Sequence, residues 1–170
     1  MANDKLALFN ARQNLTWSWD RLYRVYCDGE NILLIRIGGQ RLFEAQHLAM
    51  HLGLIGGLIA AIMENKAKPP EDFSEWDEQP ASELMSQHKH NVAVAIGDVL
   101  QCTLDPPATF GHGPNKGRWS LVLKNGEKMS FQFEDLESMH AAVQTLPKIF
   151  GDDSKVHVVW DAKKERYRKV

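Results

Sequence analysis

Apolar and polar residues alternate most clearly in two segments that each contain a glycine turn. In residues 21–40 (RLYRVYCDGENILLIRIGGQ), two runs rich in branched and aromatic residues flank an Asp-Gly pair. In residues 118–135 (RWSLVLKNGEKMSFQFED), apolar residues occupy every second position on both sides of an Asn-Gly pair. Both pairs favour tight turns because glycine accepts a positive φ without steric cost. The sequence therefore predicts two β-hairpins, and the alternation in the second predicts one buried face.

The second half of the chain also contains further strand patterns and one helical pattern. Short strand-like pieces lie on either side of Gly97 in residues 91–105, and a last strand is expected at residues 156–160. After Phe133, apolar residues follow helical spacing and acidic residues come early, where the helix dipole favours them. This pattern predicts an amphipathic helix that ends at Gly151, with its apolar face formed by Leu136, Met139, Val143 and Leu146.

The strongest helix signal lies in residues 41–66, which lack proline and are rich in Leu, Ala, Met and Glu. Within it, the stretch HLAMHLGLIGGLIAAIM is apolar on every side after Leu52. An apolar run of about sixteen residues is shorter than the roughly 20 that a membrane-spanning helix needs, so no transmembrane span is predicted. The acidic, proline-rich segment that follows, residues 67–80, is expected to be a long surface loop.

Small residues recur at every fourth position along this apolar helix. Such a ridge lets another helix or a sheet approach the backbone closely. Close packing would compensate for the interior glycines, each of which costs about 1 kcal/mol relative to alanine. A helix that is apolar all round must also be covered all round. We therefore expect self-association, as a homodimer or other homo-oligomer, through residues 45–63. The ridge consists of Ala45, Ala49, Gly53, Gly57 and Ala61.

The order of elements is hairpin, apolar helix, loop, one or two strands, hairpin, helix and strand. Antiparallel strands joined by tight turns, with helices laid against them, are typical of the α+β class. The length of 170 residues fits a single domain over residues 1–170.

The segment from IGDVLQCTLDPP to GRWSLVLKNGEKMSFQFEDLESMHAAVQTLPKIF resembles part of a bacterial pleckstrin-homology-like (PH-like) or GRAM-like domain. The resemblance implies a bent antiparallel sheet plugged by the amphipathic helix, with residues 41–95 as a helical and loop insertion. It also implies binding of phosphoinositides, other lipids or proteins, without catalysis. The first hairpin turn is acidic (CDGEN), which argues against phosphoinositides. The residues that match the pattern are Ile96, Trp119, Leu121, Leu123, Gly126, Phe131 and Phe133.

Composition and charge limit the classes of partner and the cellular location that can be expected. The net charge of −2 and the pI near 6.4 give no overall basic surface, so no nucleic-acid partner is predicted. The basic tail KKERYRKV is expected to be solvated surface. Cys27 and Cys102 are too few and too distant for a disulfide framework or a zinc knuckle, and both lie in apolar runs. The N-terminus lacks a signal-peptide pattern, which predicts a cytoplasmic protein.

One group of residues suggests metal chemistry. On a helix, Glu44, His47 and His51 are spaced one turn apart on one face, a spacing that suits a divalent metal ion. His88 and His90 are further candidate ligands. The H-E-x-x-H pattern of zinc proteases is absent, because no Glu follows the first histidine. These residues are therefore a candidate metal site of an unspecified kind. The other interpretation is that the histidines mark the polar edge of a helix that becomes wholly apolar after them.

Two other candidate motifs, a glycine cluster and a glycine-rich loop, do not indicate a catalytic or ligand-binding site. The glycines at 53, 56 and 57 match neither a dinucleotide-binding nor a P-loop pattern. The loop FGHGPNKG, with His112 and Lys116, is interpreted as a connector. No catalytic residue and no cofactor is assigned.

The sequence predicts a small cytoplasmic binding or scaffolding module of unknown ligand that self-associates through its 45–63 helix. Two alternatives remain. One is a metal-dependent enzyme or metal sensor that uses Glu44, His47 and His51. The other is a peripheral membrane-associated, lipid-binding domain with a protein or lipid partner.

Overall fold

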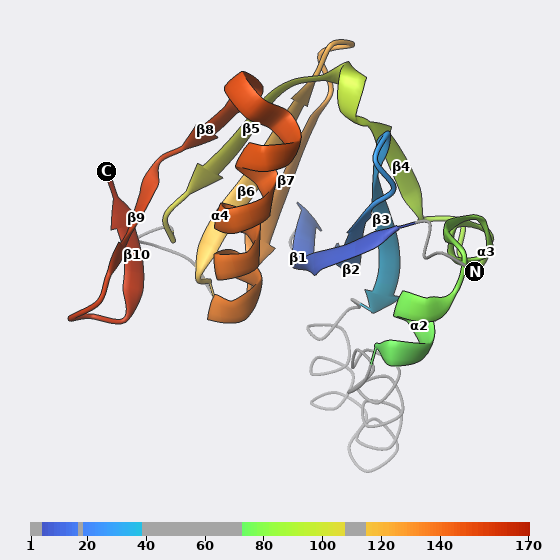
Figure 1. The fold of residues 1–170 in the computed structure, drawn as a ribbon, viewed down its shortest axis with the longest axis horizontal. Helices are drawn as coiled ribbons and strands as arrows, with labels where there is room; N and C mark the ends of the chain where they lie inside the picture. The colour runs from blue at the N-terminus through green and yellow to red at the C-terminus, as the bar shows by residue number, and fades with distance from the viewer. Residues whose placement is uncertain (1–4, 17–18, 39–72, 108–114) are drawn as a thin grey trace, which may run out of the picture.

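The structure is a computed structural model that describes residues 5–16, 19–38, 73–107 and 115–170 (Figure 1). The predicted apolar helix at 41–66 lies outside these residues. The strands are β1 (Leu6–Thr16), β2 (Trp19–Cys27), β3 (Asn31–Gly38), β4 (Val92–Ala95), β5 (Val99–Asp105), β6 (Gly117–Leu123), β7 (Lys128–Phe133), β8 (Ser154–Val156), β9 (Val158–Asp161) and β10 (Arg166–Lys169). The α-helices are α2 (Ser74–Glu78), α3 (Ala81–Ser86) and α4 (Leu136–Phe150).

Among the described residues, eight strands form one bent, open sheet in the order β4-β3-β2-β1-β7-β6-β5-β8 (Figure 1). Neighbouring strands are antiparallel except β5 and β8, which are parallel. Strands β9 and β10 form a separate antiparallel pair. The predicted α+β class, with a mostly antiparallel sheet built of hairpins, is confirmed.

Both predicted hairpins are present. β2 and β3 are joined at Gly29, and β6 and β7 at Gly126. Gly29 has a φ of 96° and Gly126 a φ of 87°, a conformation that side chains with a Cβ rarely adopt. At the first turn, the Asp28 carboxylate accepts hydrogen bonds from the backbone N–H groups of Glu30 (2.9 Å) and Asn31 (2.6 Å). The local sequence therefore determines both turns.

Strand β1 was not predicted from the sequence, although it lies near the middle of the sheet. It pairs along most of its length with β2, and at Arg12 and Gln13 with β7. A register irregularity after Ala7 places the consecutive residues Leu8 and Phe9 in the same core. A bulge of this kind breaks the period of two, and polar residues are most of the strand after Phe9, with Ala11 a small buried exception. The alternation rule therefore misses β1.

The main core lies between the sheet and α4, which runs across the sheet in Figure 1. The ring of Trp119 stacks on Phe131 with centroids 4.6 Å apart, and Phe9 packs edge-on against Trp119 at 5.3 Å. The predicted amphipathic helix is confirmed, and Gly151, with a φ of 54°, ends it. Its buried residues are Ser138, Met139, Ala142, Leu146 and Phe150.

A second, smaller core covers the opposite face of β2 and β3. Leu84 of α3 is fully buried there against Tyr26, Leu33 and Ile35. Because β3 is covered on both faces, its apolar residues run consecutively instead of alternating. Residues 67–80 were predicted to be a surface loop, but Ser74–Glu78 of this segment form α2, and α3 follows at Ala81.

The C-terminal region also differs from the expectation. The strand predicted at 156–160 is divided at His157 into β8, which pairs with β5, and β9. The basic tail is exposed, as expected, except for the buried Tyr167, but it also forms β10 and pairs with β9. β4, within the predicted 41–95 insertion, pairs with β3. In the part of the chain that the structure describes, no helix is long and apolar enough to cross a membrane.

Candidate functional site

The residues of the two sequence-predicted sites lie in a segment that the structure does not describe, residues 39–72. The predicted metal site and the predicted self-association ridge therefore both remain predictions. The metal residues are Glu44, His47 and His51, and the ridge residues are Ala45, Ala49, Gly53, Gly57 and Ala61.

The additional candidate ligands His88 and His90 lie between α3 and β4. Their rings are 5.2 Å apart, and Arg36 Nη1 is 3.2 Å from His88 Nε2. Burial and the charges of Arg36, Lys89 and Arg21 lower the pKa of His88. The pKa of His90 is also lowered, by desolvation and then by the same surrounding charges. Within the described residues, no group of three or more His, Cys, Asp or Glu side chains is placed to hold a metal ion.

A polar cleft of about 530 Å³ opens between β1, β2, α2 and the N-terminal half of α4. Apolar side chains from β1 and α4 form part of its lining, and charged and polar side chains form the rest. The lining residues are Leu8, Phe9, Asn10, Arg24, Phe73, Ser74, Asp77, Asp135, Glu137, Ser138 and Ala141.

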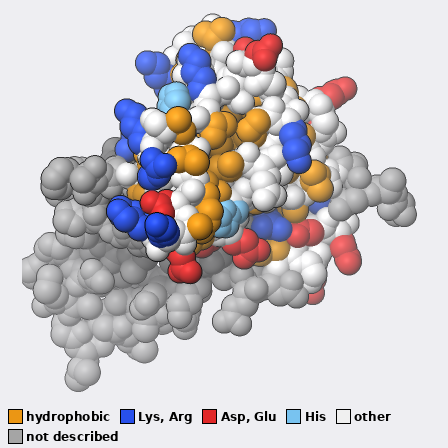
Figure 2. All heavy atoms as spheres, turned by 60° about the vertical axis from the view of Figure 1, so that its left-hand side comes forward, with side chains coloured by type: hydrophobic (Ala, Val, Ile, Leu, Met, Phe, Trp, Pro, Cys, Tyr) orange, Lys and Arg blue, Asp and Glu red, His pale blue; other side chains and the backbone are white. Residues whose placement is uncertain are grey.

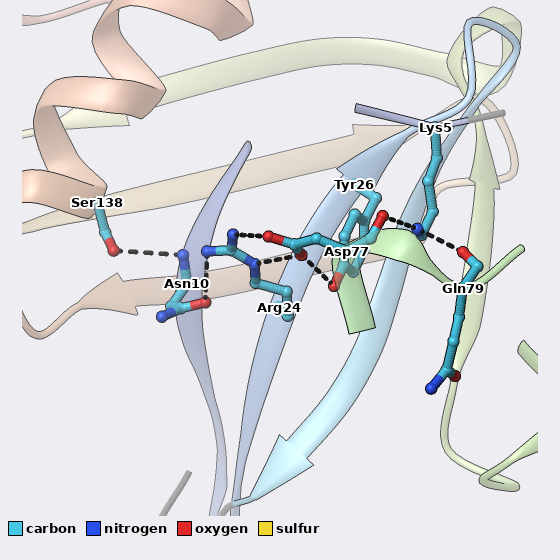
Figure 3. Close-up of polar contacts among 7 residues, drawn as sticks. All are labelled: Lys5, Asn10, Arg24, Tyr26, Asp77, Gln79 and Ser138. Carbon is cyan, nitrogen blue, oxygen red and sulfur yellow. Dashed lines mark hydrogen bonds and ion pairs between the residues drawn. The ribbon is translucent and has the colours of Figure 1, made fainter. Parts of the chain in front are cut away.

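Arg24 and Asp77 form the central ion pair of this cleft (Figure 3). Arg24 Nη2 is 2.9 Å from one carboxylate oxygen of Asp77, and the hydroxyl of Tyr26 donates to the other at 2.8 Å. The guanidinium also lies 4.9 Å from the centre of the Phe73 ring. Burial, followed by the hydrogen bond and charge of Asp77, raises the pKa of Tyr26 above its ordinary value. The phenol therefore stays protonated and donates to Asp77.

Lys5 holds the end of α2 against the sheet. Its side chain is buried, with the whole residue only 5% exposed, and Nζ donates to the backbone carbonyls of Asp77 at 2.9 Å and Gln79 at 2.6 Å (Figure 3). The ammonium also lies 4.7 Å from the centre of the Tyr26 ring. Carbonyl groups at a helix C-terminus carry partial negative charge and attract a cation. The α2 wall of the cleft is thus fixed by Lys5, which immediately precedes β1, and by Arg24 and Tyr26 of β2.

The first turn of α4 forms the opposite wall. Asp135 caps the helix by accepting a hydrogen bond from the backbone N–H of Ser138 at 2.6 Å. The hydroxyl of Ser138 donates to Asp135 at 3.1 Å and accepts from the backbone N–H of Asn10 at 3.2 Å. The side-chain oxygen of Asn10 accepts from Arg24 at 3.4 Å. A continuous set of polar contacts therefore connects α2 with α4 across β1 and β2.

The charges of the lining are unequal. The cleft is lined by three carboxylates, those of Asp77, Asp135 and Glu137, and by one guanidinium, that of Arg24. Arg24 is paired with Asp77, and Asp135 is engaged as the helix cap. Glu137 lies exposed at the rim. The Ser138 hydroxyl bonds to the cap and to β1, so its geometry is that of a positioning group. The cleft is suited to hold a cationic group by charge attraction.

Sequence reasoning did not identify the residues of this cleft. Asp77 lies in the segment predicted to be a loop, where only Phe73 and Trp76 stood out as apolar anchors. Arg24 interrupts an apolar strand, which was a usable signal because a cation on a covered strand face needs an anionic partner. The identity of that partner could not be read, since Asp77 is 53 residues away in the chain.

Fold and cleft together define an α+β protein with a bent, mostly antiparallel sheet and a polar cleft between that sheet and its helices. No protein-family model, curated protein or solved structure matches the chain.

Proposed function

We propose that the chain is a binding module with a PH-like arrangement, and that its cleft takes a positively charged group of a partner, such as a lysine or arginine side chain. The arrangement is supported by α4, which follows directly after the β6–β7 hairpin and packs against the bent sheet, as the resemblance implies. The observation that carries the proposal is the lining of the cleft, where three carboxylates face one guanidinium.

A purely architectural role for the polar network explains only part of this lining. Lys5, Arg24 and Asp77 hold α2 in place, and Asp135 and Ser138 hold α4 to β1. Glu137 takes no part in the contacts that join these elements. Its carboxylate lies at the rim, in the first turn of α4 where the helix dipole favours it, and it adds negative charge to the cleft. This excess charge favours a ligand that brings a cation.

The test is a titration of the protein with acetylated octalysine, in which binding is measured from the changes of the backbone amide chemical shifts in NMR spectra. Octaglutamate is the peptide control. Glu137→Lys places a cation at the rim and should weaken octalysine binding about tenfold, because an attraction is replaced by a repulsion. The matched control is Glu127→Lys, which makes the same charge change at an exposed residue of the β6–β7 turn.

Shifts that centre on the first turn of α4 and on α2, with unchanged affinity in the Glu127→Lys variant, would support the proposal. Equal weakening by both substitutions would show that octalysine responds only to the overall charge of the protein and would contradict a site in the cleft. Absence of binding to the unmodified protein would contradict it as well.

A further inference from the structure

The C-terminal hairpin of β9 and β10 stands apart from the large sheet. In Figure 1 it lies on the opposite side of α4 from α2. The carboxylate of Asp161 accepts hydrogen bonds from the backbone N–H groups of Lys163 (3.1 Å) and Lys164 (3.3 Å), so the turn is ordered by local contacts. Trp160 and Val159 of β9 lie opposite Tyr167 and Arg168 of β10. The hairpin therefore presents a defined surface.

An aromatic cluster anchors this hairpin to α4. His140 Nδ1 lies 2.6 Å from the hydroxyl of Tyr167, and its ring lies 4.6 Å from that of Trp160. Tyr167 and Val158 are buried, as expected of an anchored hairpin. Trp160 and Val159 nevertheless remain 37% and 39% exposed. Two large apolar side chains on a fixed hairpin thus remain in contact with solvent.

The same hairpin concentrates positive charge. The hairpin, residues 158–169, contains five Lys or Arg residues, all exposed, and two acidic residues, Asp161 and Glu165, a net charge of +3. Because the whole chain carries −2, the remaining residues carry −5. Figure 2, in which the left-hand side of Figure 1 comes forward, shows hydrophobic side chains with Lys and Arg side chains around them. The charge of this protein is therefore strongly asymmetric, and the basic end coincides with exposed apolar groups.

We propose that the β9–β10 surface binds an anionic lipid bilayer. Lys and Arg next to an anionic membrane each contribute about 1 kcal/mol of attraction. Trp is favoured at the boundary between headgroups and acyl chains, where an apolar ring and a polar N–H are both satisfied. Strand alternation places Val159 with Arg166 and Arg168 on the outer face of the hairpin, whereas Trp160 lies on the face toward α4, beside His140, and is partly exposed there.

Two other readings explain less of this surface. Charged residues on an exposed edge strand prevent unwanted strand pairing, but that role does not require an exposed Trp160 beside Val159. Single-stranded nucleic acid would bind the charges and stack on an aromatic ring. The exposed aliphatic side chains of Val159 and Val170 would not contribute to that binding. A hairpin that stands out from the fold suits a broad surface better than an extended peptide, which docks in a groove or along a strand.

The test is co-sedimentation of the full chain with vesicles of three parts phosphatidylcholine and one part phosphatidylserine, with pure phosphatidylcholine vesicles beside them. We expect binding to the anionic vesicles only, with release at high salt. The double substitution Lys163→Glu, Lys164→Glu should weaken binding by about 30-fold, the value for two lost contacts of about 1 kcal/mol each. The matched control is Lys124→Glu, Lys128→Glu, which changes the charge equally at exposed residues near the β6–β7 turn.

A second substitution tests the apolar contribution. Val159→Ser removes an exposed aliphatic group without touching the aromatic cluster, and it should weaken vesicle binding about threefold with the charge unchanged. Equal loss in the hairpin and control charge variants would overturn the proposal. So would binding to a short single-stranded DNA without binding to anionic vesicles. These outcomes do not depend on the cleft, so this inference and the proposed function can fail separately.

Discussion

At the scale of single residues, burial and hydrogen bonding set the chemistry of the side chains. Cys102 is buried beneath α4 in the main core, and burial raises the pKa of its thiol to about 12. Cys27, at the end of β2, is only half-buried. The two cysteines therefore differ in access and in their ability to form a thiolate, although both lie in similar apolar sequence runs.

We expect one thiol to react with a disulfide reagent in the native protein and two after unfolding. The thiolate is the reactive form, and at neutral pH Cys102 is both inaccessible and protonated. A Cys27→Ser variant should then show almost no reaction until denaturant is added, whereas Cys102→Ser should react as the unmodified protein does. Fast native reaction of the Cys27→Ser variant would show that the core opens around Cys102.

Asp28 makes the stability of the first hairpin depend on pH. Burial alone would raise the pKa of its carboxyl, but hydrogen bonds from the side chain and backbone of Asn31 and from the backbone of Glu30 outweigh it and lower the pKa. The unfolded carboxyl, with a pKa of about 3.9, takes up its proton at a higher pH than the folded one. The stabilisation is therefore complete above that value and is lost as the pH falls through the folded pKa.

The substitution Asp28→Asn keeps an acceptor oxygen and removes the titrating group. We expect the free energy of unfolding of this variant, from urea denaturation, to fall less steeply with pH below about 4 than that of the unmodified protein. Glu127→Gln, at an exposed carboxylate in the other hairpin turn, is the matched control. If all three proteins lose stability in parallel over this range, the hydrogen bonds at Asp28 do not stabilise its charged form.

At the scale of elements, the stability of α2 depends on partners and not on its own sequence. It has five residues, far fewer than an isolated helix needs in water. Neither its N-cap Phe73 nor the N-cap of α3, Pro80, provides a side-chain cap. α4, in contrast, has 15 residues, a capping Asp135 and a continuous buried face. The pair α2–α3 is therefore the part of the described fold that depends most on contacts with the sheet.

Replacing Asp77 by Ala should release α2 locally. The change removes the ion pair with Arg24 and the hydrogen bond from Tyr26, and it leaves a partly buried guanidinium without this carboxylate. We expect amide hydrogen exchange in residues 74–86 to accelerate at least tenfold while that of α4 stays the same. Glu78→Ala, at an exposed neighbour on the same helix, should change neither. Acceleration throughout the sheet would indicate global and not local destabilisation.

At the scale of the whole molecule, β1 joins the two halves of the sheet. Its pairing with β7 is brief, but Arg12 bonds to the carboxylate of Glu134 at 2.7 and 2.9 Å and also pairs with Asp20. The core cluster includes residues of both halves, from Leu8 to Tyr167. Contacts between residues that are distant in sequence therefore hold the two halves of the sheet together, where β1 and β7 pair over only two residues.

Self-association through the 45–63 helix is a separate prediction at this scale. Light scattering at micromolar concentration should show a homo-oligomer, because a helix apolar on all sides requires a second covering surface. Gly53→Leu, Gly57→Leu would fill the small-residue ridge and should shift the protein toward monomer. A monodisperse monomer for the unmodified protein would contradict this prediction.

The sequence by itself determined the two glycine hairpins, the amphipathic helix α4 and its end at Gly151. Each is encoded by residues within a few positions of one another, through alternation, helical spacing and the φ that glycine allows. These local signals were sufficient for the α+β class and for an antiparallel sheet built of hairpins, whereas the bend of the sheet was expected only from the PH-like resemblance.

Only the tertiary structure decided the central strand β1, the helix α2 and the strand β10. β1 depends on a bulge that fits it to the core, and α2 depends on Arg24 and Tyr26, which bond to Asp77 from 53 and 51 residues away. β10 pairs with the nearby β9, but its position depends on His140 of α4, which contacts Tyr167 from 27 residues away. The cleft arises in the same way, since its charges come from elements that are separate in sequence and adjacent in space. The basic charges of the hairpin, in contrast, lie in one contiguous run, residues 163–169, and only the position of this run beside α4 is a tertiary feature. Local sequence patterns do not identify residues that are neighbours only in space. The energy that stabilises these elements comes from contacts that form only when the chain has folded.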